Sequence, residues 1–178
     1  MGRILIACEF SGIVRDAFIA EGYDAVSCDL IPTEQPGPHI QDDVLRVIER
    51  EQFDMMIAFP PCTHLASSGA RWFKDKQKKQ REAIEFVLSL ANSNIERIAI
   101  ENPIGVLSTK WRKPDQIIQP WQFGHGEVKS TCLWLKNLPV LSQQKLLMVV
   151  YLVYTSNRQG LTDGNVVVVP IAVLRPQW

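Results

Sequence analysis

The stretch RILIACEFSGIVRDAF, residues 3–18, indicates the fold class of this chain. Its first six residues form a short, continuous apolar run, as expected of a strand that is covered on both faces. A turn containing Gly12 follows, and the residues from Val14 to Ala20 read as a short helix. This order recurs along the chain and is typical of βαβ units. The sequence therefore predicts an α/β fold with a mostly parallel, doubly wound sheet.

The other elements follow from similar patterns. The Pro- and Gly-rich residues Ile31 to His39 are expected to form a loop. Apolar, β-branched residues predict two late strands, from Leu146 to Val153 and from Val166 to Leu174. The helix expected over Gln77–Ala91 places Ile84, Val87, Leu88 and Ala91 on one face. Strands are expected at Arg3–Cys8, Asp24–Cys28, Asp54–Phe59, Arg97–Glu101 and Thr131–Lys136, and further helices at Val14–Ala20 and Val44–Glu51.

Length and composition indicate one domain. The 178 residues are 46% hydrophobic, which is enough apolar material for a single core. We expect residues 1–141 to form the domain and residues 142–178 to form a C-terminal segment packed on it. The 19 basic residues balance the 19 acidic ones, so any contact with nucleic acid has to come from a local patch.

The cysteines and the N-terminus indicate a cytoplasmic protein. The four cysteines show no CxxC pair and no metal-ligand grouping with the three histidines, so we expect reduced thiols and no metal site. The start of the chain does not resemble a secretory signal. No apolar run reaches the roughly 18 residues that a membrane-spanning helix needs.

Two acids follow the turn at Gly12 and suggest a nucleotide site. A glycine after a first strand lets the backbone approach a ligand at a helix N-terminus, although an ordinary βα turn has the same feature. Asp29 ends the next strand, where doubly wound folds hold ribose hydroxyls. Asp42 and Asp43 stand at the start of the expected helix 44–51. A role as the N-cap of this helix would by itself explain one of these two acids.

A second pair of motifs predicts covalent chemistry. The sequence FPPCTHLASSG, residues 59–69, begins where a buried strand ends, so two prolines present Cys62 in a rigid loop at the carboxyl edge of the sheet. We expect the Cys62 thiol to be exposed there. We interpret Cys62 as a nucleophile. We interpret the other three cysteines as structural thiols. Glu101-Asn102-Pro103 ends the strand 97–101 and places a carboxylate on the same edge.

Together these motifs resemble the DNA cytosine-5 methyltransferase family, in the family's order. Pro61-Cys62 is similar to its Pro-Cys nucleophile motif and Glu101-Asn102 to its Glu-Asn-Val motif. The resemblance covers roughly residues 3 to 136 and is strongest to small, standalone phage-encoded relatives without an evident target-recognition domain. It implies a Rossmann-like methyltransferase fold, with residues 1–141 as a methyltransferase-like catalytic domain. It also implies a protein of the cytoplasm of a bacterial or phage-infected cell. The residues that match the family's cofactor-binding positions are Phe10, Ser11, Gly12, Asp29, Asp43 and Pro60.

By this resemblance the chain is an S-adenosylmethionine-dependent enzyme that acts on cytosine in DNA. Cys62 would attack C6 of a flipped-out cytosine and Glu101 would hold the N3 side, with Pro61 and Asn102 completing the catalytic set. Lys129 stands in the segment where the family has target-contacting arginines, and Arg71 and Lys74 lie in a basic stretch with aromatic residues that suits nucleic acid. A separate specificity protein would supply target recognition.

Two other functions stay open at this stage. The chain could be a catalytically silent regulator that binds S-adenosylmethionine or nucleic acid, or an enzyme that acts on free pyrimidine nucleotides. The neutral charge and the missing recognition region favour the nucleotide substrate, whereas the basic stretch with Arg71 and Lys74 favours DNA. A test of S-adenosylmethionine binding would distinguish a cofactor-dependent enzyme from a protein that only shares its fold.

Overall fold

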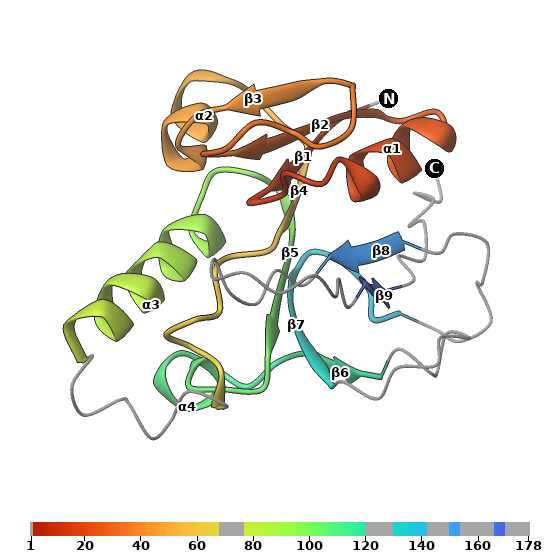
Figure 1. Ribbon diagram of the computed structural model, residues 1–178. Coiled ribbons are helices and arrows are strands. Elements are labelled where there is room, and N and C mark those ends of the chain that lie inside the picture. The colour runs from red at the N-terminus through yellow and green to blue at the C-terminus, as the bar shows by residue number, and fades with distance from the viewer. Residues whose placement is uncertain (1, 68–76, 120–129, 142–149, 154–165, 170–178) are drawn as a thin grey trace.

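The computed structural model describes residues 2–67, 77–119, 130–141, 150–153 and 166–169, and these form a sheet with helices on both sides (Figure 1). The strands are β1 (Arg3–Ala7), β2 (Asp24–Asp29), β3 (His39–Gln41), β4 (Met55–Ala58), β5 (Arg97–Pro103), β6 (Gln116–Ile118), β7 (Thr131–Lys136), β8 (Val150–Val153) and β9 (Val166–Val169). The helices are α1 (Ile13–Ala20), α2 (Val44–Arg50), α3 (Gln77–Ala91) and α4 (Leu107–Lys110).

Seven strands form the main sheet in the order β3-β2-β1-β4-β5-β7-β6. The pairs from β3 to β5 are parallel, and β7 runs antiparallel to both β5 and β6. The strand order reverses beside β1, which is the switch point of a doubly wound sheet. The expected α/β fold with a mostly parallel, doubly wound sheet is thus confirmed.

Side chains alternate between two cores because successive residues of a strand point to opposite faces. On one face, Leu5 of β1 packs in a cluster with buried residues of α2 and α3. On the other face, Ile4 and Ile6 pack in a cluster with Val14 and Phe18 of α1. Figure 1 shows α1 on one side of the sheet, and α2 and α3 on the other. Two covered faces explain the continuous apolar strands.

The sequence located most of these elements, with differences of detail. His39, expected at the end of a loop, begins the short strand β3. In α3 the buried residues are Val87 and Leu90, so Leu90 takes the core position expected of Leu88, while Ile84 and Ala91 pack against the same core as predicted. Neither α4 nor β6 was expected, because such short elements carry no readable periodicity.

The C-terminal strands β8 and β9 pair antiparallel in a separate two-stranded sheet. Both lie inside the apolar stretches that predicted strands, and the remaining parts of those stretches fall outside the described residues. The division of the chain at residue 141 stays a prediction.

Candidate active site

The predicted site residues gather at the carboxyl edge of the parallel strands. Asp29 is the last residue of β2, and the turn with Gly12 follows β1. Cys62 comes four residues after the end of β4. Glu101 lies two residues before the end of the neighbouring strand, β5. Because β2, β1, β4 and β5 are consecutive neighbours in the sheet, their carboxyl ends form one continuous edge, where open α/β folds bind ligands.

The turn between β1 and α1 has an unusual backbone. Cys8 has a φ of 59° and Gly12 a φ of 77°, so both lie in the left-handed region, which a non-glycine residue seldom adopts. Gly12 is the N-cap of α1 and brings no side-chain cap. Phe10 is tied to the next loop, because its carbonyl accepts a 2.9 Å hydrogen bond from the backbone N–H of Glu34. The chain thus turns sharply at the edge of the sheet, as predicted for a nucleotide-binding turn.

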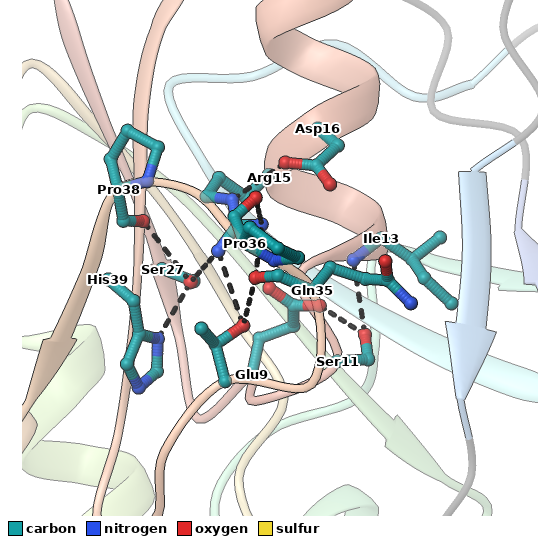
Figure 2. Close-up of polar contacts among 11 residues, drawn as sticks. Glu9, Ser11, Ile13, Arg15, Asp16, Ser27, Gln35, Pro36, Pro38 and His39 are labelled. Carbon is teal, nitrogen blue, oxygen red and sulfur yellow. Dashed lines mark hydrogen bonds and ion pairs between the residues drawn. The ribbon is translucent and has the colours of Figure 1, made fainter.

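Glu9 is a buried acid in this turn, with 6% of its surface exposed. Its Oε1 accepts a hydrogen bond from the Ser11 hydroxyl, whereas its Oε2 is buried and has no hydrogen-bond partner among the described residues (Figure 2). Burial raises the pKa of the Glu9 carboxyl, although the Ser11 hydroxyl and the Arg15 charge act in the opposite direction. The turn therefore holds an acid that burial disfavours in its ionised form.

Arg15, on α1, is fully buried and ties the helix to the loop between β2 and β3 (Figure 2). Its Nη1 donates to the hydroxyls of Ser27, at 3.2 Å, and Thr33, at 3.3 Å. Its Nη2 donates to the carbonyl oxygens of Gln35, at 3.1 Å, and Pro36, at 3.3 Å. A buried guanidinium with several acceptors is a structural clamp.

The buried Arg15 side chain explains why glycine occupies two nearby positions, Gly12 and Gly37. A Cβ at Gly12 would lie 2.5 Å from Nη2 of Arg15, and one at Gly37 would lie 2.7 Å from its Cζ. Gly12 therefore makes room for Arg15, besides shaping the turn. Sequence reasoning missed this role of Arg15, because an arginine at the start of a short helix reads as a surface residue.

The two acids predicted for the cofactor have local hydrogen bonds. Asp29 Oδ1 accepts from the backbone N–H of Ile31, at 3.2 Å. Asp43 is the N-cap of α2, and its Oδ1 accepts from the backbone N–H of Leu45 at 2.9 Å. The neighbouring Asp42 instead forms an ion pair with Arg50. Capping thus accounts for Asp43, as the sequence allowed, while Asp29 ends its strand as expected.

Thiols beside these acids are held in the neutral form. Burial, reinforced by the charges of Asp29 and Asp43, raises the pKa of the Cys8 thiol. Burial also raises the pKa of Cys28 to about 11. All four cysteines are free thiols, as predicted.

The proline loop after β4 holds Cys62 in a tight turn. The carbonyl oxygen of Cys62 accepts hydrogen bonds from the backbone N–H groups of Leu65 and Ala66, each at 2.9 Å. Pro60 is buried and Pro61 exposed, so the prolines lead the chain from the core to the surface. Cys62 itself is half-buried, where the sequence predicted an exposed thiol. The reason is the close packing of this loop against the segment after β5.

Several contacts hold the Cys62 loop against the segment that follows Glu101. The side-chain amide of Asn102 donates to the carbonyl oxygen of Pro60 at 2.8 Å. The backbone N–H of Val106 donates to the carbonyl oxygen of Leu65 at 2.9 Å. At Gly105 a Cβ would lie 1.9 Å from that same carbonyl oxygen, so only glycine fits. The structure thus brings together the two motifs that the sequence singled out.

Glu101 is half-buried, and its Oε1 accepts a hydrogen bond from the hydroxyl of Thr131. Thr131 begins β7 and is 3% exposed. The next residue, Cys132, is buried, and burial together with the negative charge of Glu101 raises the pKa of its thiol to about 11. Sequence reasoning did not assign Thr131 to the site, because nothing in the pattern showed that β7 runs antiparallel beside β5.

The nucleic-acid residues expected from the sequence, Arg71, Lys74 and Lys129, lie outside the described residues. Nearby, Lys78 and Lys79 are exposed at the start of α3. Within the described ranges, no group of three or more His, Cys, Asp or Glu side chains could hold a metal ion. No described helix has both the length and the apolar character needed to cross a membrane.

Comparisons with known proteins found similarity only among solved structures. No protein-family model matches the sequence, and no curated protein matches it. An rRNA methylase from Escherichia coli is 13% identical with a TM-score of 0.45, over 76% of this chain and 57% of that one. The 16S rRNA methylase RmtB is 14% identical with a TM-score of 0.41, over 76% and 56% of the two chains. This chain thus spans somewhat more than half the length of these two structures.

Proposed function

We propose that this chain is an S-adenosylmethionine-dependent methyltransferase that modifies C5 of cytosine in DNA. One observation carries the proposal: the Asn102–Pro60 hydrogen bond, at 2.8 Å, holds the Cys62 loop against the segment that bears Glu101. A nucleophile and a carboxyl on two adjacent strand ends are the pair that attack on a pyrimidine requires. The turn at Gly12 and the acid Asp29 lie along the same edge.

The residues at the cofactor end fit S-adenosylmethionine. Asp29 offers a carboxylate to the ribose hydroxyls. The buried Oε2 of Glu9, unpartnered among the described residues, is an acceptor suited to an ammonium group. When bound there, S-adenosylmethionine supplies an electrophilic methyl group.

The chain's own residues would then activate the cytosine. The Cys62 thiolate forms a bond from Sγ to C6, and the electron pair of the C5–C6 double bond makes C5 nucleophilic. Glu101 hydrogen-bonds the N3 side, where negative charge develops during this attack. After C5 has gained the methyl group, a water molecule takes the C5 proton and the C5–H electron pair forms the C5–C6 double bond again. The Sγ–C6 bond breaks at the same time, and its electron pair leaves with sulfur as the Cys62 thiolate. The base has to leave the helical stack for Cys62 to reach its ring.

We propose DNA as the partner, bound on the side where the basic residues after the Cys62 loop begin α3. Lys78 and Lys79 at this helix start are exposed and available to phosphates. Specificity for a target sequence would come from a partner protein. The substrate form is part of the test, because the same site would also accept a free cytosine nucleotide.

A mechanism-based trap tests the proposal. The chain is incubated with S-adenosylmethionine and 5-fluorocytosine, presented in duplex DNA, in single-stranded DNA and as the free nucleotide. Fluorine replaces the C5 proton and cannot leave as a cation, so the Sγ–C6 bond persists, and mass spectrometry locates it. We expect the adduct on Cys62 and none after Cys62→Ser, which should still bind the cofactor.

The other cysteines serve as internal controls, because the thiols of Cys8, Cys28 and Cys132 all have raised pKa values. An adduct on any of these three would refute Cys62 as the nucleophile. Cofactor binding without an adduct on any substrate would favour a silent regulator, and an adduct on the free nucleotide alone would favour a nucleotide enzyme.

A further inference from the structure

Thr131 brings a hydroxyl to the candidate active site from a strand that runs against the others. In the antiparallel pairing of β5 with β7, Thr131 faces Pro103 and Cys132 faces Asn102. The first residue of β7 therefore meets the carboxyl end of β5. With 3% of its surface exposed, Thr131 lies behind Glu101 rather than in solvent.

The Thr131 hydroxyl has two acceptors within reach and one hydrogen to donate. It donates to Oε1 of Glu101, and it lies 3.4 Å from the carbonyl oxygen of Asn102. With an ionised Glu101, the hydroxyl hydrogen points at the carboxylate. With Glu101 protonated on its other oxygen, Oε2, the hydroxyl hydrogen still points at Oε1, and Oε2–H is the donor that the N3 lone pair requires. The same residue thus supports both protonation states of Glu101.

We infer that Thr131 is a positioning residue that fixes the orientation of the Glu101 carboxyl toward the pyrimidine. This inference rests on the proposed function, in which Glu101 keeps its hydrogen bond at N3 while charge develops on the ring. A carboxyl group that rotated freely would lose that alignment, and catalytic groups act only within a narrow range of geometry. The hydroxyl of a buried strand residue provides the required support.

A structural role for Thr131 makes different predictions. If Thr131 only fills space at the start of β7, valine, which keeps its branched shape, should serve equally well. If the hydroxyl acts through Glu101, Thr131→Val should fail and Thr131→Ser should succeed. A third difference is that a residue acting through Glu101 has nothing left to act on once that carboxyl is removed.

The experiment measures single-turnover methyl transfer to cytosine DNA for the wild type, Thr131→Val, Thr131→Ser, Glu101→Ala and the double variant Thr131→Val/Glu101→Ala. Calorimetry of S-adenosylmethionine binding and thermal unfolding confirm that each variant is folded. We expect Thr131→Val to lower the rate about tenfold to a hundredfold, the range for one hydrogen bond to a charged group. Cofactor affinity should be unchanged, and Thr131→Ser should keep the rate within about threefold of the wild type.

The double variant decides between the two roles: it should react no more slowly than Glu101→Ala alone. Equal rates for Thr131→Val and the wild type, or a further loss in the double variant, overturn the inference and leave the proposed function standing. A wild-type chain that transfers no methyl group to any cytosine substrate overturns both.

Discussion

The side-chain amide of Asn102 donates a hydrogen bond to the carbonyl oxygen of Pro60, 42 residues earlier in the chain, at 2.8 Å. Asn102 is 1% exposed, so this bond is shielded from water. It joins the ends of β4 and β5 just where the two candidate catalytic loops begin. The position of Cys62 relative to Glu101 therefore depends on a residue that need not touch substrate.

We expect Asn102→Ala to lower the free energy of unfolding by about 1–2 kcal/mol, because the Pro60 carbonyl loses its donor. Chemical denaturation measures this loss. Methyl transfer should fall by more than the loss of stability explains, because the two loops are no longer joined by this bond. The control is Asn94→Ala, at an exposed position before β5. If both variants behave alike, the bond does not organise the site.

The carboxyl of Glu101 should matter through its acid–base character. Glu101→Gln keeps the size of the side chain and an oxygen for the Thr131 hydroxyl, but it cannot take up or hold a proton. We expect the methyl-transfer rate to fall by roughly 10²-fold, the usual scale for losing one acid–base group. Single-turnover kinetics measures it. An unchanged rate would remove Glu101 from the mechanism.

Asp29 should dominate cofactor affinity among the acids at this edge. We expect Asp29→Asn to weaken S-adenosylmethionine binding about tenfold, because an amide is a poorer acceptor for ribose hydroxyls. The matched control is Asp24→Asn, at the other end of the same strand, where the acid is exposed and lies 4.0 Å from Arg3. Titration calorimetry compares the two. Equal affinities would place the cofactor elsewhere.

Arg15 should be required for stability. Arg15→Met removes the donor for two hydroxyls and two carbonyl oxygens while keeping an unbranched apolar side chain. We expect the free energy of unfolding to fall by about 3 kcal/mol or more, as when one side of a buried charged network is removed. Arg46→Met, on the exposed face of α2, should change it by less than about 0.5 kcal/mol. Urea denaturation provides the comparison.

Glu9 should make stability depend on pH. Its carboxyl has a pKa raised above the ordinary value of 4.5 by burial, so the folded chain binds this proton more tightly than the unfolded chain does. The resulting stabilisation is complete below pH 4.5 and is lost as the pH rises through the raised pKa. We therefore expect Glu9→Gln, which cannot ionise, to be more stable than the wild type at pH 7.

That advantage should shrink as the pH falls toward 4, since the wild-type carboxyl then becomes neutral as well. Thermal unfolding of the cofactor-free protein across this range checks the sign. Glu21→Gln, at an exposed position after α1, should show no such trend. An advantage that grows on acidification would contradict the assignment.

The sequence predicted the parallel part of the sheet because apolar runs such as residues 3–8 are long enough to carry a pattern. It did not reveal β3 and β6, which have three residues each. Leu90 was missed because Leu88 and Leu90 flank Val87 on opposite sides of the helix, and only packing decides which flank is buried. The sequence thus predicts a strand where the local hydrophobic pattern agrees with the burial that the strand has in the fold.

The candidate site divides in the same way. Cys62 and Glu101 were identifiable because each follows a readable strand and stands beside proline. Their supports were not, because the contacts of Asn102 with Pro60 and of Thr131 with Glu101 join positions 42 and 30 residues apart. Such contacts depend on strand order and direction, which short-range periodicity does not encode.

The direction of β7 has a consequence for anyone who wishes to fuse a DNA-reading module to this chain. Its first residue, Thr131, lies at the edge of the candidate site, whereas its last, Lys136, pairs with Ile98 near the opposite edge. In a strand of six residues the two ends are roughly 17 Å apart. A module inserted ahead of β7 therefore starts beside the candidate site, while one attached after it needs a linker long enough to span the sheet.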